Sequence, residues 1–123
     1  MQHRLSQSFV FEAAHSLQRE FDRDASLRIH GHSYRATIFI AGSPEASKGM
    51  LTDLCFVKQQ LEQVRQQLDH RLLDDVPNLG PATLENLCSY IWHQLLPSLP
   101  QLQCVRVARE MTGDACELLL DKA

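Results

Sequence analysis

The sequence lacks the features of exported, membrane-anchored and disulfide-rich proteins. The amino terminus has no continuous apolar stretch of signal-peptide length, and no run approaches the roughly 20 apolar residues of a membrane helix. The four cysteines form no C-x-x-C pair, which is typical of reduced thiols rather than of a disulfide framework. We therefore expect a cytoplasmic protein that is neither exported by that route nor anchored to a membrane.

Blocks of like charge, internal repeats and linkers are also missing. The net charge is −3 and is spread along the chain, so there is no basic patch of the kind that attracts nucleic acid or anionic lipid. A small-molecule or protein partner is favoured instead. The 123 residues are enough for one domain, which we expect to span residues 1–123.

Strand and helix patterns follow one another in a clear order. Residues 5–14, 30–41, 103–110 and 115–121 have the composition or alternation of strands. Apolar residues at three- and four-residue steps predict one helix that begins after Thr52 or Asp53 and a second that begins after Thr83. Residues 17–29 and 72–82 are polar or rich in turn-forming residues, and both segments are predicted as loops.

This β-β-α-α-β-β order predicts an α+β fold. Its expected form is an antiparallel four-stranded sheet with both helices on one face. Such a sheet has two exposed edges, which must be covered, blunted or paired with another subunit. Oligomerisation is therefore expected.

Three histidines form the first candidate site. His15 ends the first predicted strand, and His30 and His32 begin the second. Residues two apart on a strand project to the same face, so His30 and His32 can converge on one ion, with His15 as the third ligand. Three imidazoles with a fourth position left open are typical of catalytic zinc. His3 and His93 have no such neighbours in the sequence, and we interpret them as surface or packing residues.

Two further positions carry groups with more than one interpretation. Asp69 and His70 follow the first predicted helix, where a cation can simply interact with the helix dipole. Alternatively, the carboxylate fixes the imidazole tautomer and makes His70 a proton-transfer group. Glu110 ends an apolar strand and is either a solvated strand end or an acceptor for the N–H groups of a guanidine-like heterocycle.

Six segments together resemble a known family along essentially the whole chain. They are FEAAH, IHGHSY, LTDLCFVK, LDH, PATLEN and ARE, in family order and at compatible spacing. The combination resembles the 6-pyruvoyltetrahydropterin and 6-carboxytetrahydropterin synthases. The short length is more similar to the queuosine-pathway (7-deazaguanine) members.

The resemblance implies a fold, a metal and a substrate. The fold would be a T-fold, whose subunits join their sheets as trimers and stack into a homohexamer with active sites between subunits. Zinc on His15, His30 and His32 would bind the side-chain hydroxyls of 7,8-dihydroneopterin triphosphate, and Glu110 would hold the pterin ring. Acting as a Lewis acid, zinc would favour loss of triphosphate and carbon–carbon cleavage, which releases acetaldehyde and gives 6-carboxytetrahydropterin.

One residue departs from the family pattern. Four residues before the first histidine of HGH, the family has a cysteine that acts as base together with the Asp-His pair, whereas this chain has Ser26. An alcohol has a pKa several units above that of a thiol, so Ser26 is a poor substitute. His70, Asp24 or Asp22 could serve as the base instead, or the chemistry could differ.

The departure leaves several functions open. The leading hypothesis is a zinc-dependent pterin lyase like 6-carboxytetrahydropterin or 6-pyruvoyltetrahydropterin synthase. The alternatives are an aldolase-like cleavage of the dihydroneopterin side chain, a pterin-binding protein with little catalysis, and a relative with vestigial histidines. Met111, where relatives often have Thr or Ser, is a further difference beside the expected ring pocket.

Overall fold

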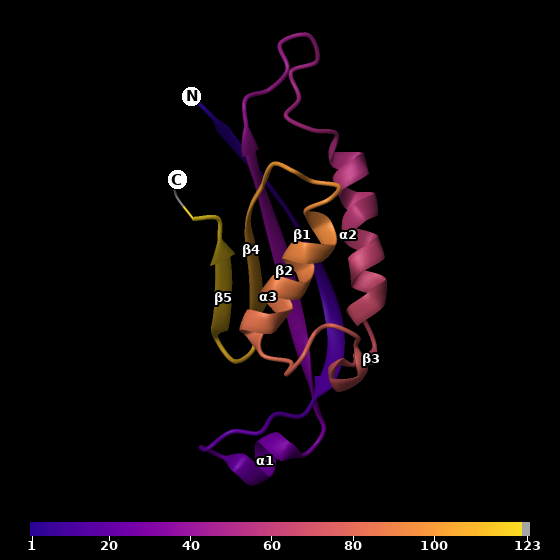
Figure 1. The fold of residues 1–123 in the computed structure, drawn as a ribbon, viewed down its shortest axis with the longest axis vertical. Coiled ribbons are helices and arrows are strands. Elements are labelled where there is room, and N and C mark those ends of the chain that lie inside the picture. The colour runs from indigo at the N-terminus through magenta and orange to yellow at the C-terminus, as the bar shows by residue number, and fades with distance from the viewer. Residues whose placement is uncertain (122–123) are drawn as a thin grey trace.

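Two long antiparallel strands run along the protein, described here from a computed structural model over residues 1–121 (Figure 1). Lys122 and Ala123, the end of the expected domain, lie outside the described residues. The elements, in chain order, are β1 (His3–His15), α1 (Arg23–Leu27), β2 (His30–Gly42), α2 (Leu54–Leu68), β3 (Arg71–Leu72), the 3₁₀ helix η1 (Leu73–Asp75), α3 (Leu84–Leu95), β4 (Leu102–Arg109) and β5 (Asp114–Leu119).

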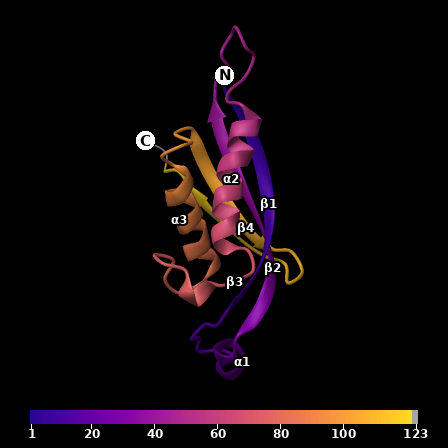
Figure 2. The same ribbon diagram turned by 90° about the vertical axis from the view of Figure 1, so that its right-hand side faces the viewer.

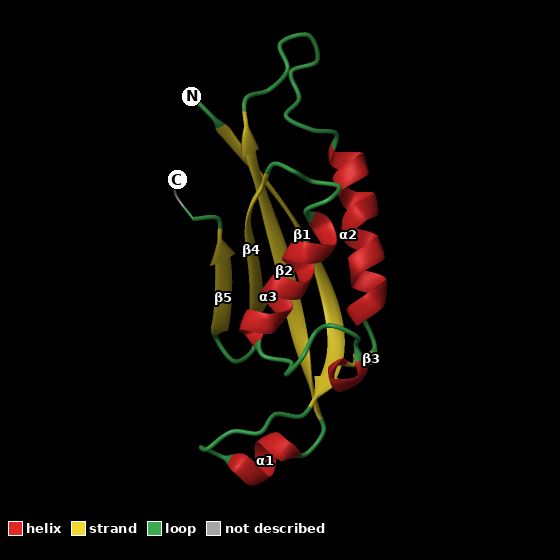
Figure 3. Ribbon diagram, viewed as in Figure 1, coloured by secondary structure: helices red, strands yellow, loops and turns green. Residues whose placement is uncertain are grey.

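The strands form one sheet in the order β3-β1-β2-β4-β5 (Figure 3). β1, β2, β4 and β5 are antiparallel neighbours, as predicted from the sequence. The prediction of four strands was wrong by one, because Arg71 and Leu72 add a two-residue strand parallel to β1. A strand of two residues is too short to show an alternating pattern in the sequence. Its position depends on where α2 ends and the chain turns back to β1.

Helices α2 and α3 cover one face of this sheet, which confirms the α+β prediction (Figure 2). Their apolar stripes face inward, so that Val57, Leu61, Leu87 and Ile91 are at most 2% exposed. Of the two predicted N-caps for α2, Asp53 fills the position by accepting a hydrogen bond from the Cys55 amide. None of the helices within residues 1–121 is long and apolar enough to cross a membrane.

Two predicted loops contain short helices. Residues 23–27 form α1, which extends beyond the end of the sheet between β1 and β2 (Figure 1). Residues 73–75 form η1, directly after β3. These single turns are too short to show a helical period, so tertiary contacts decide them.

The chain turns sharply where α2 ends. Asp69 is the C-cap and His70 follows with φ 57°, in the left-handed region that glycine usually occupies at this position. The His70 amide donates to the Glu12 carbonyl at 2.6 Å and fixes this turn against β1. The imidazole is thus held at the same end of the sheet as the three candidate zinc ligands.

Candidate active site

The three predicted zinc ligands converge at the end of β1 and the start of β2. His15 and His30 are cross-strand partners, and His32 lies two residues further along β2. The His15 Nε2 atom is 3.0 Å from His30 Nε2 and 3.1 Å from His32 Nε2. One ligand atom from each residue lies within 4.8 Å of the others, as a common metal ion requires.

Backbone carbonyls orient two of these imidazoles. His15 Nδ1 donates to the Ala82 carbonyl at 2.9 Å, and His30 Nδ1 donates to the Arg28 carbonyl at 2.7 Å. A carbonyl only accepts, so in the neutral rings the proton sits on Nδ1 and Nε2 presents a lone pair. Two lone pairs 3.0 Å apart repel unless a cation lies between them. The donor set therefore fits a metal ion, and backbone carbonyls already orient two of the three rings.

Burial favours the unprotonated form of two of these imidazoles, His15 and His32. His15 is 1% exposed, and burial lowers its pKa despite the opposing Ala82 bond. Burial also lowers the pKa of His32, to about 4, with a further contribution from the Arg109 guanidinium. At neutral pH both rings are available as metal ligands, which must be deprotonated to bind.

Ser26 lies beside the histidines. It is buried in α1 and lines a cavity of about 440 Å³ together with all three imidazoles. The Leu17 amide donates to the Ser26 carbonyl at 2.7 Å and ties α1 back to the chain just after β1. The Ser26 hydroxyl donates to the Arg23 carbonyl at 3.0 Å. Of the alternative bases, Asp22 lines this cavity, whereas Asp24 is exposed and is not part of the lining.

Asp69 and His70 form the predicted pair. Asp69 Oδ2 lies 2.9 Å from His70 Nδ1 and accepts from Arg65, while Oδ1 accepts from the Glu12 amide. The Glu12 amide and then the His70 ring hold the pKa of Asp69 below its ordinary value. His70 is 78% exposed and lines a cavity of about 470 Å³ that also touches His32.

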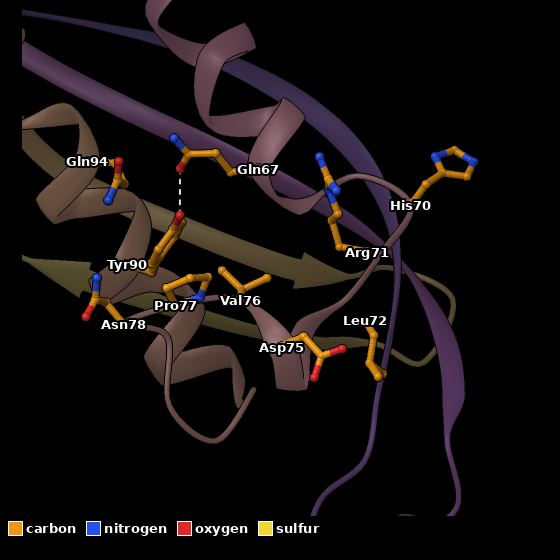
Figure 4. Close-up of a pocket in the computed structure, with 10 residues that line it drawn as sticks. All are labelled: Gln67, His70, Arg71, Leu72, Asp75, Val76, Pro77, Asn78, Tyr90 and Gln94. Carbon is orange, nitrogen blue, oxygen red and sulfur yellow. Dashed lines mark hydrogen bonds between the residues drawn. The ribbon is translucent and has the colours of Figure 1, made fainter.

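A second cavity reaches the other side of His70. It has a volume of about 620 Å³ and is lined by residues of α2, α3 and the segment between them (Figure 4). Tyr90 donates to Gln67 Oε1 at 2.6 Å on its wall. The His70 ring points away from this pair, and the three histidines are not part of the lining. This cavity thus lies apart from the metal-ligand cluster.

Glu110 faces the opposite side of the sheet from the histidines. Its carboxylate accepts from Arg35 Nε at 2.9 Å, and Arg35 lies an odd number of residues from His32 along β2. The cavity beside Glu110 has a volume of about 290 Å³ and also contacts Met111, which is 90% exposed. Glu110 therefore does not join the three histidines within one chain.

The sequence matches one protein family over nearly its whole length. The family model described as 6-pyruvoyl tetrahydropterin synthase matches residues 4–119. The chain belongs to the 6-pyruvoyl tetrahydropterin synthase family. This confirms the resemblance that the six sequence motifs indicate.

Relatives within the family carry two different names. The chain is 33% identical over 113 residues to human 6-pyruvoyl tetrahydrobiopterin synthase, covering 80% of this chain and 78% of that protein. It is 32% identical to 6-carboxy-5,6,7,8-tetrahydropterin synthase of Synechocystis, covering 87% and 86%. The structure of the Caenorhabditis elegans 6-pyruvoyl tetrahydropterin synthase superposes with a TM-score of 0.82 at 23% identity, over 98% of this chain and 97% of that chain. The fold is thus that of the 6-pyruvoyl tetrahydropterin synthase family.

Sequence reasoning missed one residue at the site of this family member. Arg109 lines the cavity of Ser26 and the histidines, and its Nη1 is 3.4 Å from His32 Nε2. Within the ARE motif, sequence reasoning selects Glu110, which lies on the face of the sheet opposite the histidines. Strand alternation gives a signal that could have found Arg109, because neighbours on a strand point to opposite faces.

Proposed function

We propose that this protein is a zinc-dependent lyase that cleaves the side chain of 7,8-dihydroneopterin triphosphate, in the manner of 6-carboxytetrahydropterin or 6-pyruvoyltetrahydropterin synthase. The observation that carries the proposal is the convergence of three Nε2 atoms, two of them on imidazoles whose Nδ1 atoms donate to carbonyls. The names of the relatives supply the substrate class. We place the reaction in the cytoplasm.

The residues divide the work between metal and proton transfer. His15, His30 and His32 hold zinc, which supplies Lewis acidity to an oxygen of the substrate side chain. His70 moves the proton, with Asp69 fixing its Nδ1–H at 2.9 Å and leaving Nε2 free to accept. Ser26 is a poor base, because its hydroxyl already donates to the Arg23 carbonyl and no carboxylate or imidazole accepts from it among its contacts in the structure.

A homohexamer completes this proposed site. Glu110 lies on the opposite face of the sheet from the histidines, so a Glu110 that binds the pterin ring must act in a site to which another subunit supplies the zinc ligands. The short edge strand β3 and the edge strand β5 offer backbone groups for joining sheets between subunits. Each active site then lies between subunits, and the Arg35 pairing gives way to the pterin.

Ser26 supports a second candidate function. A chain without the usual thiol either cleaves the side chain differently, as an aldolase-like enzyme does, or binds pterins with little turnover. Ser26→Cys separates these possibilities from the leading one. If the substitution raises turnover from near zero, the chain is a binding protein; if it lowers turnover, Ser26 is adapted to the reaction.

Product analysis tests the proposal directly. Zinc-loaded protein is incubated with dihydroneopterin triphosphate, and the products are identified by mass. The expected products are triphosphate with either 6-carboxytetrahydropterin and acetaldehyde or the 6-pyruvoyl compound, and 6-hydroxymethyldihydropterin would favour the aldolase-like alternative. Intact substrate at high protein concentration contradicts the lyase assignment. Ser43→Cys, in an exposed turn, is the matched control for Ser26→Cys.

A further inference from the structure

Arg109 is a cation at the three-histidine cluster. Ala108 pairs with Arg35, which lies on the opposite face of β2 from His32. Arg109 is the next residue, so its side chain projects to the face that carries the histidines. The guanidinium is 20% exposed and lines the cavity that it shares with Ser26.

The turn between β4 and β5 holds this guanidinium in place. Arg109 Nη2 donates to Asp114 Oδ2 at 2.9 Å, across the strand pair. The Thr112 hydroxyl donates to the same oxygen at 2.8 Å and orients it. Arg109 therefore cannot turn away from the histidines without losing its carboxylate partner.

The Nε and Nη1 atoms of Arg109 have no carboxylate or carbonyl acceptor within residues 1–121. Its Nε is buried and makes no hydrogen bond, and its Nη1 has His32 Nε2 as a neighbour at 3.4 Å. His32 Nε2 is the atom that a metal ion would take. Once His32 binds a metal, Nη1 needs an acceptor, which a ligand in the cavity can supply.

The charges in the cavity specify what that acceptor is. Arg19, Arg28 and Arg109 line it, and among its described lining residues Asp22 is the one acidic side chain. A guanidinium N–H forms a stronger hydrogen bond with a carboxylate than with a neutral oxygen, because the bond is charge-assisted. Arg19 and Arg28 lie on the segment between β1 and β2, whereas Arg109 lies directly at the histidines, where the first carbons of a bound side chain would be.

We propose that Arg109 is a specificity-determining residue that binds the carboxylate of a 6-carboxylated pterin beside the three histidines. This inference rests on the proposed function and narrows it. Of the two outcomes named in the relatives, it selects the product with a carboxylate over the neutral pyruvoyl product. A neutral side chain would leave Asp114 as the one carboxylate that pairs with this guanidinium among the described residues.

The test compares two ligands that differ in one group. Zinc-loaded protein is titrated with 6-carboxypterin and with 6-hydroxymethylpterin, following pterin fluorescence. Arg109→Gln should weaken binding of the carboxylate about tenfold or more, the value expected for a charge-assisted hydrogen bond, and change binding of the alcohol by less than about twofold. Arg109→Lys should recover part of the loss, because it restores the positive charge but not the guanidinium geometry.

Arg106→Gln is the matched control. Arg106 lies on the same strand and pairs with Glu117 across β4 and β5, but it is not part of the cavity lining. It should leave both affinities unchanged. The proposal is overturned if Arg109→Gln weakens the binding of both pterins by the same factor. It is also overturned if the variant binds both with the affinity of the wild type.

Two further probes separate this inference from related ones. Inorganic triphosphate tests whether Arg109 serves phosphate instead, and a loss of triphosphate binding with unchanged 6-carboxypterin binding overturns the carboxylate assignment. If the wild-type protein binds neither pterin, the proposed function is contradicted. Acetate binding is then measured to test the carboxylate site on its own. A tenfold loss of acetate binding in Arg109→Gln would then still support a carboxylate site at Arg109, and an unchanged affinity would reject it.

Discussion

Asp69 connects the end of α2 to β1. Replacing it should lower the free energy of unfolding by an amount that depends on pH. The carboxylate accepts from the Glu12 amide at 2.9 Å and from Arg65 at 3.0 Å, and it contacts His70 at 2.9 Å. Asp69→Ala removes all three contacts. Asp69→Asn keeps an oxygen for the Glu12 amide but loses the charge.

The contacts differ in what they contribute. Losing the hydrogen bond to the Glu12 amide costs about 0.5–1.5 kcal/mol, because Glu12 is exposed and water can replace the carboxylate. The Arg65 pair is one-third exposed on the arginine side and contributes about 0.5 kcal/mol or less, and the exposed His70 contributes little. We therefore expect Asp69→Ala to lower the free energy of unfolding by about 1–2 kcal/mol and Asp69→Asn by about half as much. Glu62→Ala, which removes the other acidic partner of Arg65, should cost less than about 0.5 kcal/mol.

The sign of the pH dependence follows from the depressed pKa of Asp69. The stabilisation is fully present above the unfolded-state pKa of about 3.9 and is lost as the pH falls through the lower, folded-state pKa. Wild type and Asp69→Asn should thus converge in strongly acid solution. Urea unfolding of metal-free protein, followed by circular dichroism at several pH values, measures this. An Asn variant as unstable as the Ala variant, or a gap that persists in acid, refutes the reasoning.

Other perturbations test the turn, the cap, the core and the metal. His70→Gly should keep the free energy of unfolding within about 1 kcal/mol of wild type, because glycine suits the left-handed position, yet abolish turnover; a large loss of stability in urea would contradict this. Thr83→Ala should cost about 1 kcal/mol through the lost α3 cap, and equilibrium dialysis should show weaker zinc binding, because the neighbouring Ala82 carbonyl orients His15. Leu87→Ala should cost about 2–5 kcal/mol in urea unfolding, since Leu87 is fully buried. Zinc at 100 times its Kd should stabilise the protein by about 2.7 kcal/mol in thermal unfolding, and His15→Ala should remove that gain.

Much of the fold follows from local patterns. Alternation along β1 and β2 and the apolar steps in α2 and α3 appear directly in the sequence, and Thr83 caps α3 as its residue type predicts. The short elements α1, β3 and η1 do not appear there. Each contains five residues or fewer, so contacts with the rest of the molecule rather than periodicity decide its conformation.

The candidate site divides in the same way. The H-x-H spacing on a strand is enough to predict that His30 and His32 share a face, and the proximity of His15 follows once β1 pairs with β2. The pairing of Asp69 with His70 is also visible as adjacent residues. By contrast, the Ala82 carbonyl that orients His15 comes from a distant loop, and a backbone group leaves no trace in residue type.

The sequence by itself determined the family, the sheet-and-helix order and the three candidate metal ligands, because these depend on residue type and short spacing. The tertiary structure decided which side of the sheet each functional group occupies. It placed Arg109 with the histidines and Glu110 on the opposite face, although the two are neighbours in the chain. The physical reason is strand alternation: one residue of register reverses the direction of a side chain, and only the paired sheet fixes that register.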